Sequence, residues 1–204
     1  MTLKINDFKK QKIIDCIANH AAFDGWGDTA LRTAAQECDI SWNEAQFLFP
    51  NRPIDMISAH SYYGDTLMCE AVQAMENFTT LRVHEKVEIS ILLRFELFQD
   101  KREAIRRASS ILALPQYTGK SACLLARTCD QIWLLAGDTA QDYNRYSKRL
   151  LLAGVYVSSF MYWLSDESES LNNTRRFVRT RLKNVLHVFG SLGKLRSRIY
   201  KRFT

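Results

Sequence analysis

The stretch ALRTAAQECDISWNEAQFLFPNRPIDMI, residues 30–57, predicts two short helices joined by a tight turn. Asp28 or Thr29 is suited to cap the first helix, which we expect over about 30–37, because short polar side chains accept hydrogen bonds from a first helical turn. Ser41 is suited to cap the second, and Glu44 follows three residues later, as in a capping box. The stretch therefore predicts a helix-turn-helix unit.

Helices are expected on both sides of this unit. Pro50 and Pro53 precede a long helix over about 54–75, because proline is tolerated in a first helical turn but not in an interior. A helix before the unit is expected to end near Gly25, which allows a left-handed turn. Its apolar residues recur at helical spacing: Phe8, Ile13, Ile14, Ile17 and Ala21.

The rest of the chain also has helical patterns. No comparable segment alternates apolar and polar residues with period two, and only 8 Gly and 3 Pro occur in 204 residues, so the fold class expected is an all-α bundle. The segment Leu150–Trp163 is apolar around most of its circumference and is predicted to lie in the centre of the bundle. The further helices are expected over about 81–98, 102–114, 121–136, 143–164 and 171–188.

Charge is distributed unevenly along the sequence. The net charge is +6, yet residues 170–204 hold ten Lys and Arg and no acidic residue, so residues 1–169 carry −4. Such a basic segment favours an anionic surface, which could be phospholipid, nucleic acid or an acidic partner. The longest apolar run, Leu150–Leu164, is shorter than the roughly 18 to 20 residues that span a bilayer.

The sequence shows no catalytic motif. The four histidines fall on different segments without metal-ligand spacing, and neither HExxH nor GxSxG occurs, so we expect no catalytic residues, metal or cofactor. The five cysteines are odd in number and lack CxxC spacing, which predicts buried, reduced thiols. No signal-peptide pattern opens the sequence, so a bacterial cytoplasmic or membrane-associated setting is expected.

The first third resembles the DNA-binding domain of TetR-type regulators, whose pattern is TxxxIAxxAGVSxGxxYxxF. The helix that would enter the major groove, Ser41–Leu48, has Glu44 as its one charged residue, and a carboxylate is repelled by phosphate. We therefore expect no specific DNA binding. The matching residues are Thr29, Ala34, Ile40, Ser41, Ala45 and Phe49.

Residues 130–168 resemble a second family, the lipid-binding accessory proteins of ubiquinone biosynthesis, which carry DxxWxxAGD and then DxNWYTKRxxLxxVYxxTxxxWxxDxS. The resemblance implies a TetR-like fold without DNA binding, an isoprenoid quinone intermediate bound between helices, and presentation of that lipid to the di-iron demethoxyubiquinone hydroxylase. The matching residues are Asp130, Trp133, Ala136, Gly137, Asp138, Asp142, Asn144, Tyr146, Lys148, Arg149, Leu152, Val155, Tyr156, Trp163, Asp166 and Ser168.

Two sets of site residues follow. Apolar side chains of the late helices offer the contact that a polyprenyl lipid needs. The lipid-binding residues expected are Trp133, Leu134, Leu152, Tyr156, Phe160 and Met161. The family match assigns hydroxylase binding to Asn144, Arg145, Tyr146, Lys148 and Arg149, and Arg145 stands where the family has Trp.

Three regions are expected: a degenerate helix-turn-helix at 1–50, a lipid-binding bundle at 51–169 and a basic amphipathic segment at 170–204. This last segment is predicted to bind an anionic membrane, which places the protein on the inner membrane, on the matrix side if mitochondrial. The oligomeric state stays open, a homodimer included, as do two alternatives, a ligand-sensing TetR-type repressor and a lipid-modifying enzyme. The membrane-binding residues expected are Leu186, Phe189, Leu192, Lys194, Leu195, Arg196, Arg198, Ile199, Lys201, Arg202 and Phe203.

Overall fold

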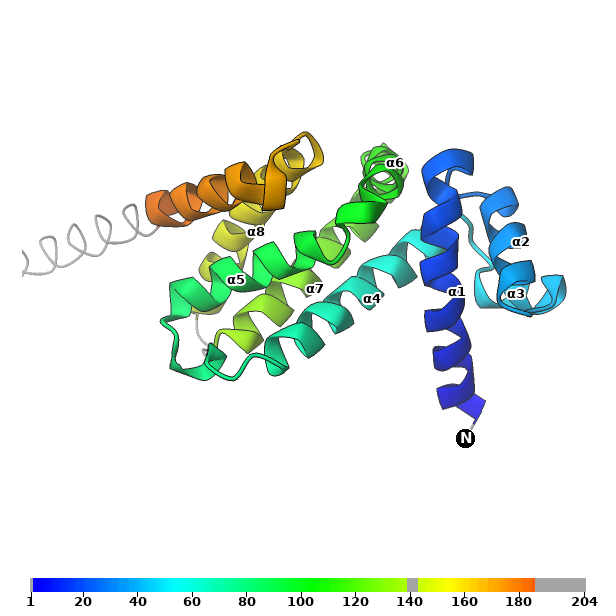
Figure 1. The fold of residues 1–204 in the computed structure, drawn as a ribbon, viewed down its shortest axis with the longest axis horizontal. Helices are drawn as coiled ribbons and strands as arrows, with labels where there is room; N and C mark the ends of the chain where they lie inside the picture. Colours follow the sequence, from blue (N-terminus) through cyan, green and yellow to red (C-terminus); the bar gives the residue numbers. More distant parts are fainter. Residues whose placement is uncertain (1, 139–142, 186–204) are drawn as a thin grey trace, which may run out of the picture.

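A computed structural model of the chain describes residues 2–138 and 143–185, with side chains over 9–138 and 146–185. The described residues form helices, turns and no strand, which confirms the expected all-α class (Figure 1). A further helix over residues 172–185 follows the labelled ones. The labelled helices are α1 (Thr2–Asp24), α2 (Asp28–Glu37), α3 (Trp42–Leu48), α4 (Ile54–Gln73), α5 (Val83–Glu96), α6 (Arg102–Leu112), α7 (Thr118–Leu135) and α8 (Tyr143–Leu164).

The predicted helix-turn-helix is present as α2 and α3. The Ser41 hydroxyl caps α3 by accepting a hydrogen bond from the Glu44 amide, as expected. The cap of α2 differs from the prediction, because Gly27 is the N-cap residue and offers no side chain. Asp28 lies inside the first turn instead, where its carboxylate pairs with the Arg52 guanidinium. A carboxylate in a first turn still favours the helix through the macrodipole.

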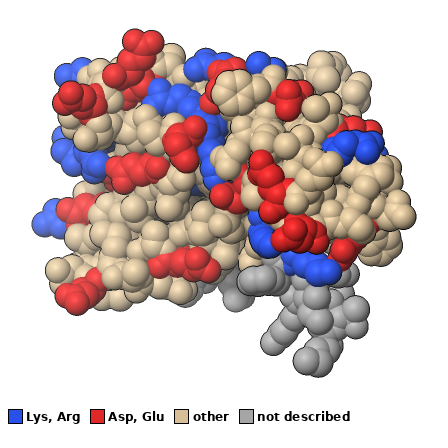
Figure 2. Space-filling view, turned by 45° about the vertical axis from the view of Figure 1, so that its right-hand side comes forward, with Lys and Arg blue, Asp and Glu red and all other residues tan. Residues whose placement is uncertain are grey.

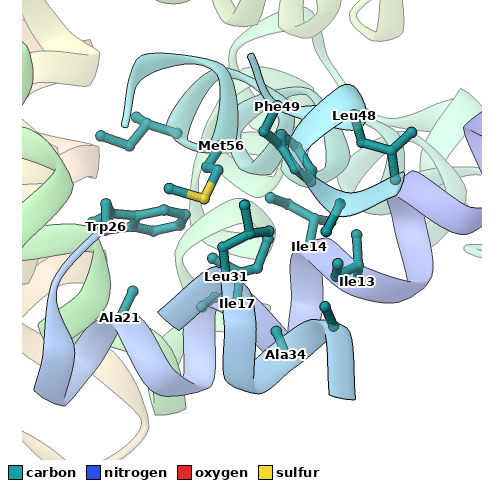
Figure 3. Packing of buried hydrophobic residues seen from close by; sticks show 14 of the residues in the cluster. Ile13, Ile14, Ile17, Ala21, Trp26, Leu31, Ala34, Leu48, Phe49 and Met56 are labelled. Carbon is teal, nitrogen blue, oxygen red and sulfur yellow. The ribbon is translucent and has the colours of Figure 1, made fainter. Parts of the chain in front are cut away.

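A first hydrophobic core joins α1, α2, α3 and the start of α4. Figure 3 shows Ile14 of α1, Leu31 of α2 and Met56 of α4 converging beside the ring of Trp26. The Trp26 indole N–H donates to the carbonyl of Ala104, 2.8 Å away, so this unit is also tied to α6. The buried indole nitrogen of Trp26 is therefore hydrogen-bonded, as buried polar atoms usually are.

A second core lies between α4, α5, α7 and α8, with Met68, Ile91, Phe95, Ile132 and Trp163 among its buried members. The long helix α4 belongs to both cores, since its first turns pack on α1 and its later turns on α5 and α7 (Figure 1). The N-terminal unit and the bundle are therefore connected by one continuous helix.

The helix over 172–185 is fixed to the bundle by polar contacts. The Asp166 carboxylate accepts hydrogen bonds from the amide and the hydroxyl of Thr174, at 2.8 and 2.5 Å. Arg179 then binds Glu88 of α5, with a shortest N–O distance of 2.8 Å. The described part of this segment thus docks on α5, and the predicted membrane-binding residues from Leu186 to Phe203 lie outside the described residues.

The five cysteines are free thiols but differ in exposure. Cys38 and Cys129 are buried, and Cys16 and Cys69 are half-buried. Cys123 is exposed on α7, so the expectation that all five are buried is wrong for this residue. Its helix presents Leu124 to the core, and the neighbouring position therefore points away from it.

His60 gives the fold a dependence on pH. The ring is buried against Phe98, 4.6 Å between ring centroids, and burial, aided by nearby Arg94 and Lys101, lowers its pKa from 6.5 to about 3. Between pH 6.5 and about pH 3, His60 is protonated in the unfolded chain but neutral in the folded one. The free energy of unfolding therefore decreases as the pH falls below 6.5. At pH 4.5 we expect a loss of about 2 to 3 kcal/mol from this residue.

The matched comparison is His60→Leu against His84→Gln, since His84 is exposed on α5. Urea unfolding at pH 7 and pH 4.5 should show a smaller loss of stability for His60→Leu than for the unchanged protein, and an unaltered loss for His84→Gln. Equal losses in all three would contradict a buried neutral His60.

Candidate functional site

Four charged residues of the family-like motif, Asp130, Asp138, Lys148 and Arg149, form an ion-pair network between α7 and α8, here called the α7–α8 clasp. Lys148 donates to the carboxylate of Asp138 at 2.8 Å, and Arg149 binds both Asp130 and Asp138. Gly137, with a φ of 84°, ends α7 in the left-handed conformation that glycine accepts most readily. The two aspartates near the end of α7 and the two basic residues near the start of α8 are therefore spaced so that they can form ion pairs.

The predicted hydroxylase-binding set is divided by this clasp. Lys148 and Arg149 turn inward to their aspartates, and the Lys148 ammonium also lies 5.6 Å from the centroid of the Trp133 ring. Tyr146 projects outward and is 72% exposed. Asn144 and Arg145 belong to the first turn of α8, and their side chains lie outside the described residues. Among the described residues of this set, Tyr146 therefore has the most exposed side chain.

Helix α8 has an exposed apolar stripe, and the expectation that 150–163 lies in the centre of the bundle is wrong. Within the described residues α8 packs against α5, α7 and the helix over 172–185, which leaves one side uncovered. The buried side carries Leu152 and Trp163. The stripe recurs at steps of four and seven residues and consists of Tyr146 at 72%, Leu150 at 76%, Val157 at 44% and Met161 at 59% exposure.

The six predicted lipid-binding residues fall into an inner and an outer group. Leu152 is buried, and Tyr156, Phe160 and Trp133 are half-buried against the second core. Leu134 and Met161 are exposed on α7 and α8. The inner and outer groups therefore lie on different sides of the same two helices, and a ligand touching both would reach from the surface toward the core.

An aromatic cluster surrounds the inner group. The ring of Phe95 stacks on Trp163 at 5.2 Å and lies 5.6 Å from Tyr156. Tyr156 and Phe160 are nearly parallel, with 11° between their planes. Stacking of this kind adds to the stability that comes from burying apolar area, so the cluster ties α5 to α8.

Next to these rings lies a buried polar network that the sequence analysis missed. Arg94 of α5 donates to the Tyr156 hydroxyl at 2.8 Å, to Ser61 at 3.2 Å, and pairs with Asp65 of α4 at 3.1 Å. Asp65 also accepts from the Thr128 hydroxyl of α7 at 2.9 Å. Four helices thus meet at one buried ion pair. The signals available were a lone arginine in the apolar run ISILLRFEL and a lone aspartate in YYGDTLM.

The network keeps Arg94 charged and Tyr156 neutral. Burial opposes the charge on Arg94, but Tyr156 and Asp65 outweigh it and raise the pKa of the guanidinium. Burial raises the pKa of the Tyr156 phenol, and the adjacent Arg94 offsets only part of that rise. Since the phenol oxygen already accepts from Arg94, its own O–H remains a donor in aromatic surroundings.

A separate groove of about 610 Å³ opens between α1, α3, α4 and α7. Phe47, Tyr62 and Tyr63 contribute aromatic rings to it, and Lys10 and Lys120 contribute positive charge. None of the six predicted lipid-binding residues lines this groove. Its volume lies within the range of small-molecule sites. The groove lies where α1, α3 and α4 meet the start of α7, and α8 does not contribute to it.

The recognition-helix position is occupied by contacts within the chain. Glu44 of α3 forms an ion pair with Lys9 of α1 at 2.6 Å, and the guanidinium of Arg32 covers the Trp42 ring at 4.2 Å. Figure 2 shows acidic and basic side chains interspersed over the visible face, where a DNA-binding surface would gather positive charge. The contacts of Glu44 and Trp42 are thus consistent with the absence of specific DNA binding, which stays a prediction.

Neither a metal site nor a membrane-spanning helix is present in the described ranges, 2–138 and 143–185. No group of three or more His, Cys, Asp or Glu in them is placed to hold a metal ion. In the same ranges, no helix has the length and apolar character needed to cross a membrane.

Comparison with known proteins points to one family. Residues 118–188 match the family model described as COQ9. The ubiquinone biosynthesis protein COQ9, mitochondrial, of Rattus norvegicus is 34% identical over 170 residues, which cover 80% of this chain and 54% of the rat protein. The corresponding protein of Schizosaccharomyces pombe is 26% identical over 180 residues, 87% of this chain and 70% of its own. Residues 118–188 therefore match the COQ9 family, and the longer alignments with the rat and fission yeast proteins support the same family.

The fold has a solved counterpart. A TetR transcriptional regulator from Nitrosomonas europaea superposes with a TM-score of 0.70 at 20% identity, covering 85% of this chain and 95% of that one. This likeness confirms the predicted TetR-like fold and concerns the fold alone. The chain spans about half the length of the rat and human COQ9 proteins, at 54% and 53%.

Gly64 tests the tight assembly around Arg94. A Cβ at this position of α4 would lie 2.5 Å from the Arg94 Nη1 atom and 2.5 Å from the Phe98 ring. Because Asp65 and the core hold both neighbours, Gly64→Ala should destabilise the protein by about 1 to 2 kcal/mol despite the better helix propensity of alanine. Gly154→Ala on α8, whose Cβ meets nothing within 4 Å, should stabilise by about 0.5 to 1 kcal/mol. Urea unfolding measures both, and a stabilising Gly64→Ala would refute the close packing.

Proposed function

We propose that the chain is a lipid-binding accessory protein of ubiquinone biosynthesis, which binds isoprenoid quinone intermediates and presents them to the di-iron demethoxyubiquinone hydroxylase. The match to the COQ9 family supports the pathway, since the relatives are named ubiquinone biosynthesis proteins. In this proposal the chemistry belongs to the hydroxylase, and the accessory chain binds without reacting.

The observation that carries the proposal is the apolar stripe of α8, defined above by Tyr146, Leu150, Val157 and Met161, beside the aromatic cluster. Four large apolar side chains exposed along one side of a helix are costly in water, and such surfaces are frequent sites of contact with another apolar body. An isoprenoid tail gains about 25 cal/mol for each Å² of apolar surface that it covers. The buried Tyr156 O–H supplies a hydrogen-bond donor of the kind that a quinone oxygen accepts.

The proposed setting is the surface of the inner membrane, on the matrix side in mitochondria and the cytoplasmic side in bacteria. The relatives from rat and fission yeast are named mitochondrial. The basic sequence after residue 169 is the part of the chain with the charge to meet anionic lipid. Both the membrane contact and the hydroxylase contact are parts of the proposal.

The lipid contact is tested with Met161→Glu, an exposed position where a charge is tolerated by the fold but opposes an apolar ligand. Isoprenoid lipid that co-purifies with the full chain, measured by mass spectrometry after solvent extraction, should fall about fivefold or more. Val83→Glu is the matched control, because Val83 is 52% exposed on α5, away from the stripe. A folded Met161→Glu protein with its full lipid complement would move the ligand away from α8.

The hydroxylase contact is tested with Tyr146→Ala. Tyr146 is exposed and takes no part in the α7–α8 clasp, so its removal should leave the fold unchanged. Co-purification with the hydroxylase should decrease about tenfold, since exposed aromatic residues are frequent binding hot spots. The control is Leu114→Ala, which removes an exposed apolar side chain at the end of α6. Undiminished association in Tyr146→Ala would place the interface elsewhere.

A further inference from the structure

Two cysteines that are 22 positions apart in the sequence have their sulfur atoms in contact. Cys16 lies on α1, and Cys38 is the residue directly after α2. The two Sγ atoms are 3.2 Å apart, with Cys38 placed as the thiol donor. Both residues are free thiols. Since a disulfide has an S–S distance of about 2.05 Å, the sulfurs need to approach by roughly 1 Å to bond.

Local contacts hold the two thiols face to face. The Cys38 thiol also contacts the carbonyl oxygen of Lys12 at 3.7 Å, and the Lys12 ammonium donates to the Cys38 carbonyl at 3.0 Å. Lys12 precedes Cys16 by one turn of α1, so the end of α2 is fixed against the turn that carries Cys16. The pair is therefore pre-aligned by main-chain and side-chain contacts on both elements.

We propose that Cys16 and Cys38 form a reversible oxidation site, at which a peroxide converts the two thiols into a disulfide that ties α1 to the end of α2. The Cys16 thiolate attacks one oxygen of hydrogen peroxide and becomes a sulfenic acid, while the other oxygen leaves as hydroxide and is protonated to water. The Cys38 sulfur then attacks the Cys16 sulfur, and its proton leaves with the hydroxyl group as a second water. Two thiols lose two electrons, and one peroxide is reduced to two waters.

The environments of the two cysteines assign their order of reaction. Cys16 is half-buried, whereas Cys38 is 3% exposed. Burial and the neighbouring Cys16 raise the pKa of the Cys38 thiol to about 12, so Cys38 stays protonated until the sulfenic acid is beside it. Cys16 is accordingly the peroxide-sensitive residue and Cys38 the resolving one.

The test uses the purified full chain with hydrogen peroxide, followed by intact mass measurement and peptide mapping without reductant. We expect a loss of about 2 Da and a linked pair of peptides containing Cys16 and Cys38, both reversed by dithiothreitol. The midpoint of thermal unfolding should rise on oxidation, because the link constrains the unfolded chain.

Two variants separate the proposed site from general thiol oxidation. Cys38→Ser should trap Cys16 as a sulfenic acid that dimedone labels, and Cys123→Ser, at the exposed cysteine of α7, should form the Cys16–Cys38 link as the unchanged protein does. Oxidation confined to Cys123, or no linked peptide at peroxide levels that fully oxidise Cys123, would overturn the proposal.

Discussion

The bundle depends on one buried ion pair, Arg94 with Asp65, which draws on all four of its main helices. Asp65 comes from α4 and Arg94 from α5, while Thr128 of α7 donates to Asp65 and Tyr156 of α8 accepts from Arg94. Burying two charges costs several kcal/mol, and the cost is offset only when geometry and hydrogen bonds are both good. The cost of leaving either charge alone is larger, so the pair favours the register of the helices in which Arg94 and Asp65 meet.

The same constraint explains details that otherwise look unrelated. Gly64 has no side chain where the guanidinium of Arg94 passes, and a larger residue would displace it. Tyr156 is held by its hydroxyl, which orients its ring toward Phe160 and Phe95. The aromatic cluster is therefore positioned in part by a polar contact between Arg94 and Tyr156.

The fold was predictable from local signals, and most of the site was not. Caps, prolines and apolar periods define where helices begin and end, so Ser41, Gly25 and Pro53 mark boundaries that the structure confirms. Which side of a helix is covered depends on neighbours far along the chain, and for that reason the exposed face of α8 was mistaken for core. Arg94 and Asp65 are 29 positions apart and carry no motif, so their pairing required the three-dimensional packing.

The motif that resembles the family contains two kinds of residue, those that form ion pairs between α7 and α8 and one that is exposed to solvent. Asp130, Asp138, Lys148 and Arg149 form ion pairs between the end of α7 and the start of α8, which is a structural role. Tyr146 lies within the same motif yet meets none of them and faces solvent. A large aromatic ring gains little from exposure to water, so Tyr146 is the motif residue whose role the ion pairs do not account for. Because Lys148 and Arg149 are held against α7 on one side of α8, the residues on its other side, Leu150 and Met161 among them, are left exposed.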